Sequence, residues 1–437
     1  MDTCFSTLKV LIEISYSIAS VAGGPSCWCK HNMSSVIVGV GQCGNQINYA
    51  LWKLLQPHLG SLNICNGDGK FPAVNVDTER KVIKQLWSSF GTRYNKNSLI
   101  TGIKGCGNNW AAGYYGNKDG GEDSLFGRTL NAIRKEVERC SSFSGIILIH
   151  SLAGGTGSGL GSLLHQSLRD EYTMNYILSC VIAPYDSGES PLQDYNASLC
   201  LSSVYEHSDG ILLFENDEAL LKSKTVYGSK QEKTVAAEEP VTLAHCNQYI
   251  AQCIAQLILP TDSVSNNSVR CVGFGLEPWE LVRSVCPMPT TKFIHPSWTA
   301  CSSENVETKA VKAACHRHGD VYCTNMSDLF VVRGSVPTFH VNSVIEQMKF
   351  VQWNPFPVDL WTAKANPLIS SKLASLAVAT NCTAVVPYLE RTVTKARVKF
   401  SANAYLHWYT KHGCTNDDFL QAFTNMDTVT ASYVDAV

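Results

Sequence analysis

Apolar and polar positions follow two alternating patterns in the first half of the chain. Five short runs are almost continuously apolar, as in strands buried on both faces, at 36–40, 71–76, 145–152, 177–184 and 210–214. Between these runs apolar residues recur at helical spacing, for example at Ile47, Leu51 and Leu55 and again at Phe126, Leu130, Ile133 and Val137. This alternation predicts an α/β domain with a parallel sheet covered by helices on both faces.

The rest of the chain has a different pattern. One apolar helix is expected at about 245–258, as a connector. Strands such as 328–333 and 373–379 are then separated by longer polar loops, which indicates a second, smaller mixed domain. From about residue 396 the pattern is helical again, with Phe419, Phe423 and Met426 on one side.

The first 32 residues do not continue either pattern. Their apolar stretch at 8–24 contains Glu13 and has no basic segment before it, so it is a poor secretory signal. Met33 stands directly before the first predicted strand. We expect 1–32 to be a leader that is disordered or a gene-model extension, and a secretory leader is the alternative.

Composition narrows the class of protein. Of 437 residues, 45% are apolar and 16% are charged, which suits a large core. Lys and Arg number 35 against 37 Asp and Glu, so no basic excess favours a nucleic-acid or membrane partner. No apolar run reaches the ~20 residues of a membrane span. The 18 cysteines are scattered without a CxxC pair, and we expect mostly buried thiols in a reducing compartment.

The first glycine loop has two interpretations. Gly39, Gly41 and Gly44 follow the first predicted strand with the GxGxxG spacing of dinucleotide-binding folds. That fold also needs an acidic residue about 20 positions further on. The nearest one that closes a strand is Asp77, 33 residues after Gly44. A nicotinamide oxidoreductase therefore remains an alternative.

The second glycine loop favours an anion site more strongly. Residues 153–159 read AGGTGSG and precede a helix expected to begin near Leu160. Small residues leave backbone N–H groups accessible at a helix N-terminus, where the dipole favours phosphate. The loop lacks the GK[ST] ending of a P-loop, so a triphosphate would need a cation for neutralisation. Asp77 and Glu79 suit Mg²⁺ held through water, and an ordinary acidic turn is the alternative.

Two further clusters carry possible chemistry. Residues 105–110, GCGNNW, add a third loop of small and amide residues. A zinc site could be drawn from Cys315, His316, His318 and Cys323, but their spacing is irregular. We prefer a surface loop there.

The motifs in their order along the chain resemble those of the tubulin superfamily. AGGTGSG is similar to the family signature, and GQCGNQI (41–47), VDTE (76–79), GNNWA (107–111), YNASL (195–199) and LHWYT (406–410) are similar to its other motifs. The resemblance runs from about residue 34 to residue 437. Among the subfamilies, NAIRKEVERCSSFSG (131–145), LLFEND (212–217) and TASY (430–433) most resemble delta-tubulins.

The resemblance implies a tubulin-like α/β fold and a set of ligands. It implies a GTP-binding domain at 33–244, a connecting helix and intermediate domain at 245–394, and C-terminal helices at 395–437. GTP or GDP and Mg²⁺ would be the ligands, with Asp77 and Glu79 serving the metal. The implied nucleotide-binding positions are Gly41, Gln42, Cys43, Gly107, Asn108, Ala153, Gly154, Gly155, Thr156, Gly157, Ser158, Glu189, Gln193, Asn216 and Asn247.

Some positions depart from the family or stay open. Asp217 competes with Asn216, because the register there is uncertain by one residue. Leu243 stands where the family places the aromatic residue that stacks on guanine. Hydrolysis in this family is completed by a neighbouring subunit, and the matching catalytic carboxylates are Glu277 and Glu280. A solvated acidic helix face is the alternative for these two.

The resemblance therefore implies a structural microtubule protein that is a weak GTPase alone. Its expected role lies in centriole and basal-body triplet microtubules and in cilium assembly. Its expected partners are other tubulin subunits or centriolar proteins, and its expected location is the cytoplasm, the cytoskeleton and the centriole. A conventional polymerising tubulin with real GTP turnover, and a nucleotide-locked subunit that never hydrolyses, remain alternatives.

Overall fold

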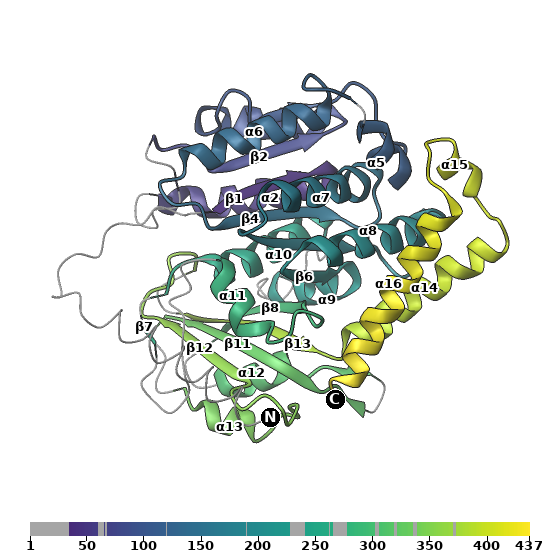
Figure 1. Ribbon diagram of the computed structural model, residues 1–437. Coiled ribbons are helices and arrows are strands. Elements are labelled where there is room, and N and C mark those ends of the chain that lie inside the picture. Colours follow the sequence, from purple (N-terminus) through teal and green to yellow (C-terminus); the bar gives the residue numbers. More distant parts are fainter. Residues whose placement is uncertain are drawn as a thin grey trace, which may run out of the picture.

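The structure is a computed structural model. It describes residues 35–437 except 60–64, 66–67, 119, 189, 228–240, 262, 265–277, 302–305, 319–320, 335–338 and 370–372. One sheet runs through the described residues in the order β3-β2-β1-β4-β5-β6-β8-β13-β11-β12-β7. Figure 1 shows its first strands in the upper half of the molecule and its last strands in the lower half.

The first six strands are all parallel and match the predicted domain. They are β1 (Ser35–Val40), β2 (Ala73–Asp77), β3 (Leu99–Thr101), β4 (Gly145–Ser151), β5 (Tyr176–Ala183) and β6 (Gly210–Glu215). The five predicted strands are confirmed to within two residues at each end. The short β3 was not predicted.

Successive side chains along a strand point to opposite faces of the sheet, so the strands contribute to two separate hydrophobic cores. Ile37, Ile147 and Leu178 pack against the layer of α2 (Gly41–Leu55), α4 (Arg80–Phe90), α10 (Leu243–Ile258) and α11 (Pro278–Val285). On the other face, Val36, Val38 and Leu148 pack against α6 (Leu125–Arg139) and α7 (Gly161–Glu171). The expectation of helices on both faces is confirmed.

The other helices of this half begin near the carboxyl ends of the strands, and they are α5 (Trp110–Lys118), α8 (Gln193–His207) and α9 (Asn216–Tyr227). The short turns η1 (Gln56–His58) and η2 (Gly91–Arg93) follow the ends of α2 and α4, and η2 is bonded to Phe71, just before β2 begins. A π-helical turn, η3 (Gly155–Leu160), comes directly before α7. The helix expected from Leu160 is therefore already coiled at Gly155, within the glycine loop itself.

The second half of the sheet is mixed. It consists of β8 (Phe293–Cys301), β13 (Ala374–Cys382), β11 (Asn325–Arg333), β12 (Val358–Ala363) and β7 (Ser263–Val264). β13 runs antiparallel to both of its neighbours, whereas β8 pairs in parallel with β6. Helices α12 (Val306–Ala314) and α13 (Val341–Ile345) pack on this half. The strands of the second half thus continue the parallel sheet.

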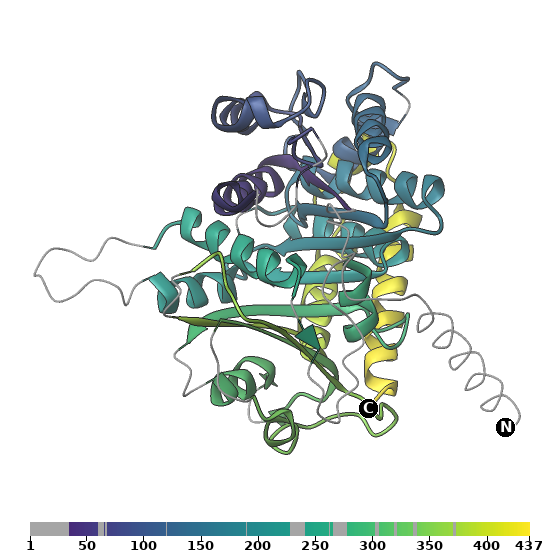
Figure 2. The same ribbon diagram turned by 90° about the vertical axis from the view of Figure 1, so that its left-hand side faces the viewer.

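The C-terminal helices flank both halves. They are α14 (Val385–Ser401), α15 (Leu406–Thr410) and α16 (Asn416–Asp435). Figures 1 and 2 show α16 running from the level of α8 down toward the second half of the sheet, beside α14. The helical end begins at Val385 and not near residue 396, so the boundary expected at 395 falls inside α14. The pattern missed this start because the first turns of α14 are buried in the same core as α8.

Three other expectations can be compared with the structure. Of the fourteen cysteines described, half are buried and half are partly exposed, so the thiols are less buried than expected. The segment with Cys315, His316, His318 and Cys323 contains a short hairpin of β9 (Arg317–His318) and β10 (Val321–Tyr322). Among the residues described, no three His, Cys, Asp or Glu side chains gather as a metal site would require, and no helix has both the length and the apolarity to cross a membrane.

Candidate functional site

The predicted glycine loops meet at one edge of the sheet. β1 lies between β2 and β4 in the sheet. The chain adds β2 and β3 on one side of β1 and then β4, β5 and β6 on the other, so the order reverses between β1 and β4, which makes this a topological switch point. Ligands of open α/β sheets bind at such points, outside the carboxyl ends of the strands. A cavity of about 400 Å³ opens there, within the size range of small-molecule sites.

Two glycines allow the loops to approach one another. Gly41 has φ +72°, which favours glycine, and a Cβ there would lie 2.8 Å from the backbone nitrogen of Gly157. A Cβ on Gly155 would lie 2.7 Å from the backbone nitrogen of Asn109. The first loop therefore touches the second, and the second touches the third. The close approach of the two glycine loops, on which the phosphate-site interpretation depends, is present.

Side-chain hydrogen bonds fasten this arrangement. The Asn45 amide donates to the carbonyls of Gly41 and Val76, both at 2.8 Å, and so ties the first loop to the end of β2. The hydroxyls of Thr78 and Thr156 are 2.7 Å apart and tie the VDTE segment to the second loop. All these side chains except Thr156 are buried.

Most of the predicted nucleotide-binding residues line the cavity. They are Gln42, Cys43, Gly107, Asn108, Ala153, Gly154, Gly155, Thr156, Gly157, Gln193, Asn216 and Asn247. Gly41 and Ser158 do not line it. Gly41 is covered by Gly157, and the Ser158 hydroxyl donates to the carbonyl of Gly154, inside the π-helical turn. Glu189 lies outside the described residues.

The predicted metal ligands also line the cavity. Asp77 ends β2 and is almost fully buried, and Glu79 follows two residues later. Burial raises the pKa of Asp77 to about 6, although hydrogen bonds from the neighbouring backbone act in the opposite direction. These two carboxylates lie beside the glycine loops, and carboxylate oxygens are among the ligands that Mg²⁺ prefers.

The opposite end of the cavity suits a base. Asn216, immediately after β6, lines it together with Asn247 and Leu243 of α10. The side chain of Asp217 instead accepts a hydrogen bond from the backbone N–H of Asp186 at 2.8 Å. Asn216 is therefore the residue of this pair that faces the cavity. Leu243 is half exposed and presents an apolar wall without an aromatic face.

Sequence reasoning missed several lining residues. Gln46, Thr78, Cys106 and Ser190 all face the cavity. The first three lie inside motifs recognised from the sequence, so their proximity could have been inferred from the loops. Ser190 had no comparable signal, because it lies in an irregular segment before α8.

Of the two predicted catalytic carboxylates the structure describes Glu280, which does not line this cavity. Glu277 lies outside the described residues. Glu280 is on α11, whose Trp279 stacks on Tyr176 at the first residue of β5. The cavity contains Ile182, near the last residue of that strand, so the two sites are separated by roughly 20 Å of strand. Glu280 is only 8% exposed, which contradicts the alternative of a solvated acidic face.

Comparisons with known proteins agree with this geometry. Residues 34–223 match the GTPase domain of the Tubulin/FtsZ family. The chain is 30% identical to the tubulin delta chain of Homo sapiens, over 92% of this chain and 99% of that protein. It is 29% identical to the tubulin delta chain of Mus musculus with the same coverage, and 27% identical to the tubulin beta chain of Bombyx mori over 91% of this chain and 93% of that protein. Because these relatives are matched almost from end to end, this chain belongs to the tubulin family, and its matched GTPase domain is a guanine-nucleotide-binding domain.

Proposed function

We propose that this protein works as a delta-class tubulin, a structural component of centriole and basal-body triplet microtubules and of cilium assembly. The observation that carries the proposal is the similarity to delta chains across nearly the whole length of both proteins. Other tubulin subunits or centriolar proteins would be its partners, in the cytoplasm and at the centriole.

The cavity's residues divide into parts that suit a guanine nucleotide. Backbone N–H groups of residues 154–157 in the second loop and of Gln42 and Cys43 would bind the phosphates. Gln193, and Glu189 four positions before it in the sequence, would bind the ribose. Asn216 and Asn247 would read the base edge. Asp77 and Glu79 would hold Mg²⁺, which supplies positive charge against the phosphates.

Among the residues that the structure describes, none from α11 lines the cavity, and Glu280 lies at the opposite edge of the sheet. A carboxylate there can reach a terminal phosphate only if a second tubulin stacks end to end on the first. We therefore propose a weak GTPase, with Glu280 and Glu277 as the residues that orient water in a neighbour's site.

The nucleotide part of the proposal is tested by purifying the protein, denaturing it and identifying the nucleotide that is released. We expect GTP or GDP in a ratio near one per chain. Recovery of NAD, or of no nucleotide from protein that also fails to bind added GDP, would contradict the proposal.

The cellular part is tested by removing the protein and sectioning centrioles for electron microscopy. We expect triplet microtubules to be replaced by doublets or singlets, and the wild-type chain to restore them. Intact triplets, together with assembly-dependent phosphate release by the purified protein, would favour a conventional polymerising tubulin.

A further inference from the structure

The loops of the nucleotide site are joined by one buried side chain that the motifs do not explain. Asn196, on α8, is fully buried. Its amide nitrogen donates to the carbonyl of Asn108 at 2.8 Å and to the carbonyl of Ala153 at 2.7 Å. Both of these residues line the cavity, one from the third loop and one from the second. Asn196 thus sets the spacing between two loops that face the nucleotide.

The amide oxygen of Asn196 also has hydrogen-bond partners. The Asn196 oxygen accepts from the backbone N–H of Trp110 at 2.9 Å and from the hydroxyl of Tyr409 at 2.6 Å. Two carbonyls on one side and two donors on the other fix which way the amide points. Burial raises the pKa of Tyr409 well above its usual value, so its hydroxyl stays a donor. Tyr409 belongs to α15, so a C-terminal helix is bonded to the side chain that spaces the two loops.

Further contacts join the same two parts of the molecule. The Asn109 amide donates to the carbonyl of Trp408 at 2.9 Å, and the Tyr195 hydroxyl donates to the carbonyl of Ala404 at 3.0 Å. The C-terminal segment around α15 is therefore bonded to the third loop and to α8 at several points.

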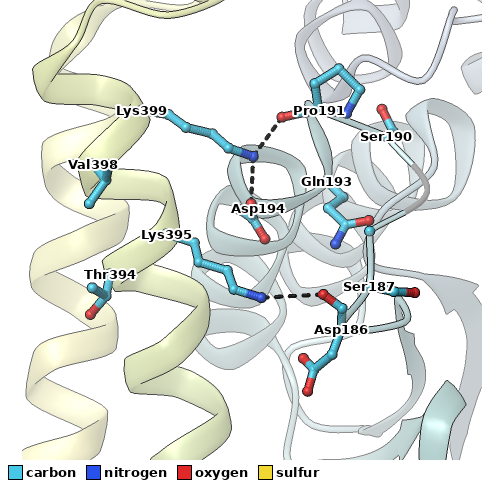
Figure 3. A pocket seen from close by; sticks show the side chains of 11 residues that line it. Asp186, Ser187, Ser190, Pro191, Gln193, Asp194, Thr394, Lys395, Val398 and Lys399 are labelled. Atoms are coloured by element: carbon cyan, nitrogen blue, oxygen red, sulfur yellow. Dashed lines mark hydrogen bonds and ion pairs between the residues drawn. The ribbon is translucent and has the colours of Figure 1, made fainter.

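Figure 3 shows a third set of contacts, around a hollow of about 590 Å³ between α14 and the segment before α8. Lys399 donates to the carbonyl of Pro191 at 2.8 Å and pairs with Asp194 at 2.6 Å. Ser190 of this segment and Gln193, the first residue of α8, also line the nucleotide cavity. Both α14 and α15 thus contact elements that form the site.

We propose that Asn196, held by Tyr409, is a positioning residue for the nucleotide site, and that through it the C-terminal helices control how tightly the nucleotide is held. The inference deepens the proposed function and rests on it. Neither side chain lines the cavity, so both act through the carbonyls and the backbone that they hold.

The test compares two buried tyrosines in one apolar core. Tyr409→Phe removes only the hydroxyl that reaches Asn196. Tyr433→Phe is the matched control, because Tyr433 is equally buried in the same core and its hydroxyl bonds to Phe293 and Asn381, away from the loops. Release of a fluorescent GDP analogue, chased with excess GDP, is measured on the full chain along with the melting temperature.

We expect both variants to melt at a lower temperature, and only Tyr409→Phe to release the analogue faster, by about fivefold, as the loss of one buried hydrogen bond predicts. Asn196→Ala should release it faster still. Equal release rates for Tyr409→Phe and Tyr433→Phe would overturn the inference. If the wild-type chain itself does not bind the analogue, the proposed function fails instead, so the two failures are distinguishable.

Discussion

Each half of the sheet buries a polar side chain that holds several backbone carbonyls, but the two halves use it differently. In the parallel half, Asn196 holds the carbonyls of two loops that line the cavity. In the mixed half, Arg333 is 1% exposed and donates to the carbonyls of Gln256, Leu259 and Pro260 at 2.5–3.1 Å. Those carbonyls belong to the C-terminal end of α10, where a cation complements the helix dipole.

Strand direction explains the difference. Parallel strands all end at the same edge, so their loops converge and a side chain that fastens them shapes a binding site. In the mixed half, β13 runs against both β8 and β11, so successive connections leave from opposite edges. The buried polar group there stabilises a helix end. A buried polar side chain that bonds to several backbone groups therefore indicates a functional site only when those groups line a cavity.

The largest effect on function is expected from Gly155→Ala in the parallel half. The new Cβ would lie within 3.1 Å of the backbone nitrogens of Asn108 and Asn109, which would push the second and third loops apart. We expect nucleotide affinity to fall on the order of 100-fold, about 3 kcal/mol. The nucleotide content of the purified protein measures this. Gly116→Ala is the control, because Gly116 is exposed on α5 and a Cβ there meets nothing within 4 Å. Unchanged nucleotide in Gly155→Ala would show that the loops need not touch.

In the mixed half, Arg333→Met should lower stability without changing the site. Three carbonyls lose a charged donor, and we expect a loss of about 2–4 kcal/mol in the free energy of unfolding. Guanidinium chloride unfolding measures it, and the nucleotide content of the folded protein should stay at the wild-type value. Arg397→Met, which removes an exposed ion pair to Asp427, should cost less than about 1 kcal/mol. If folded Arg333→Met lost its nucleotide, the proposed difference between the two halves, in which Arg333 stabilises the fold and not the site, would be wrong.

Much of the parallel half could be predicted from the sequence because its pattern is local. Buried parallel strands are apolar along their whole length, so all but the three-residue β3 were found. β8 was missed because its run contains His295, Pro296 and Ser297, which are buried only by their tertiary neighbours. The strand order around β1 is also the order of dinucleotide folds, so the fold alone does not exclude that alternative. The second glycine loop is the feature that does not fit it.

The site was predictable where glycine and amide residues cluster in the sequence. It was not predictable where it depends on contacts between residues that are far apart along the chain. Asn196 was visible as part of a motif, but its four partners lie 43 to 213 positions away along the chain. Glu280 illustrates the opposite error. Its charge suggested a solvated face as the alternative, yet the side chain is buried where α11 packs on the sheet. Charge alone does not reveal burial.

A smaller, pH-dependent effect is expected at the end of β6. Burial, followed by the nearby Glu218, raises the pKa of Glu215 to about 7, although Arg391 acts in the opposite direction. The unfolded chain releases this proton near pH 4.3, so the group costs stability as pH rises from about 4 to about 7. Glu215→Gln should therefore be more stable than wild type at pH 8, on the order of 1–2 kcal/mol after allowing for partial exposure.

Melting temperatures at pH 8 and pH 5 test the Glu215 prediction, and the difference between Glu215→Gln and wild type should shrink toward zero at pH 5. The exposed Glu390, next to Arg391 on α14, supplies the control Glu390→Gln, which removes a carboxylate from the surface and leaves the buried one in place. A variant less stable than wild type at pH 8 would mean that the pair with Arg391, 3.4 Å away, outweighs burial.

The smallest effect is expected from Thr78→Val, which sharpens the comparison within the parallel half. The change keeps the shape of a buried side chain and removes the hydroxyl that bonds to Thr156. We expect nucleotide affinity to fall about threefold, since the bond between the two loops is lost together with the bond from the same side chain to Asp77 at the cavity. Thr129→Val is the matched control, because Thr129 is also buried and its hydroxyl bonds to Leu125 within α6. Both variants should lose similar stability, measured by thermal unfolding. If both also weakened nucleotide binding equally, general softening of the domain, and not the fastening of its loops, would control the site.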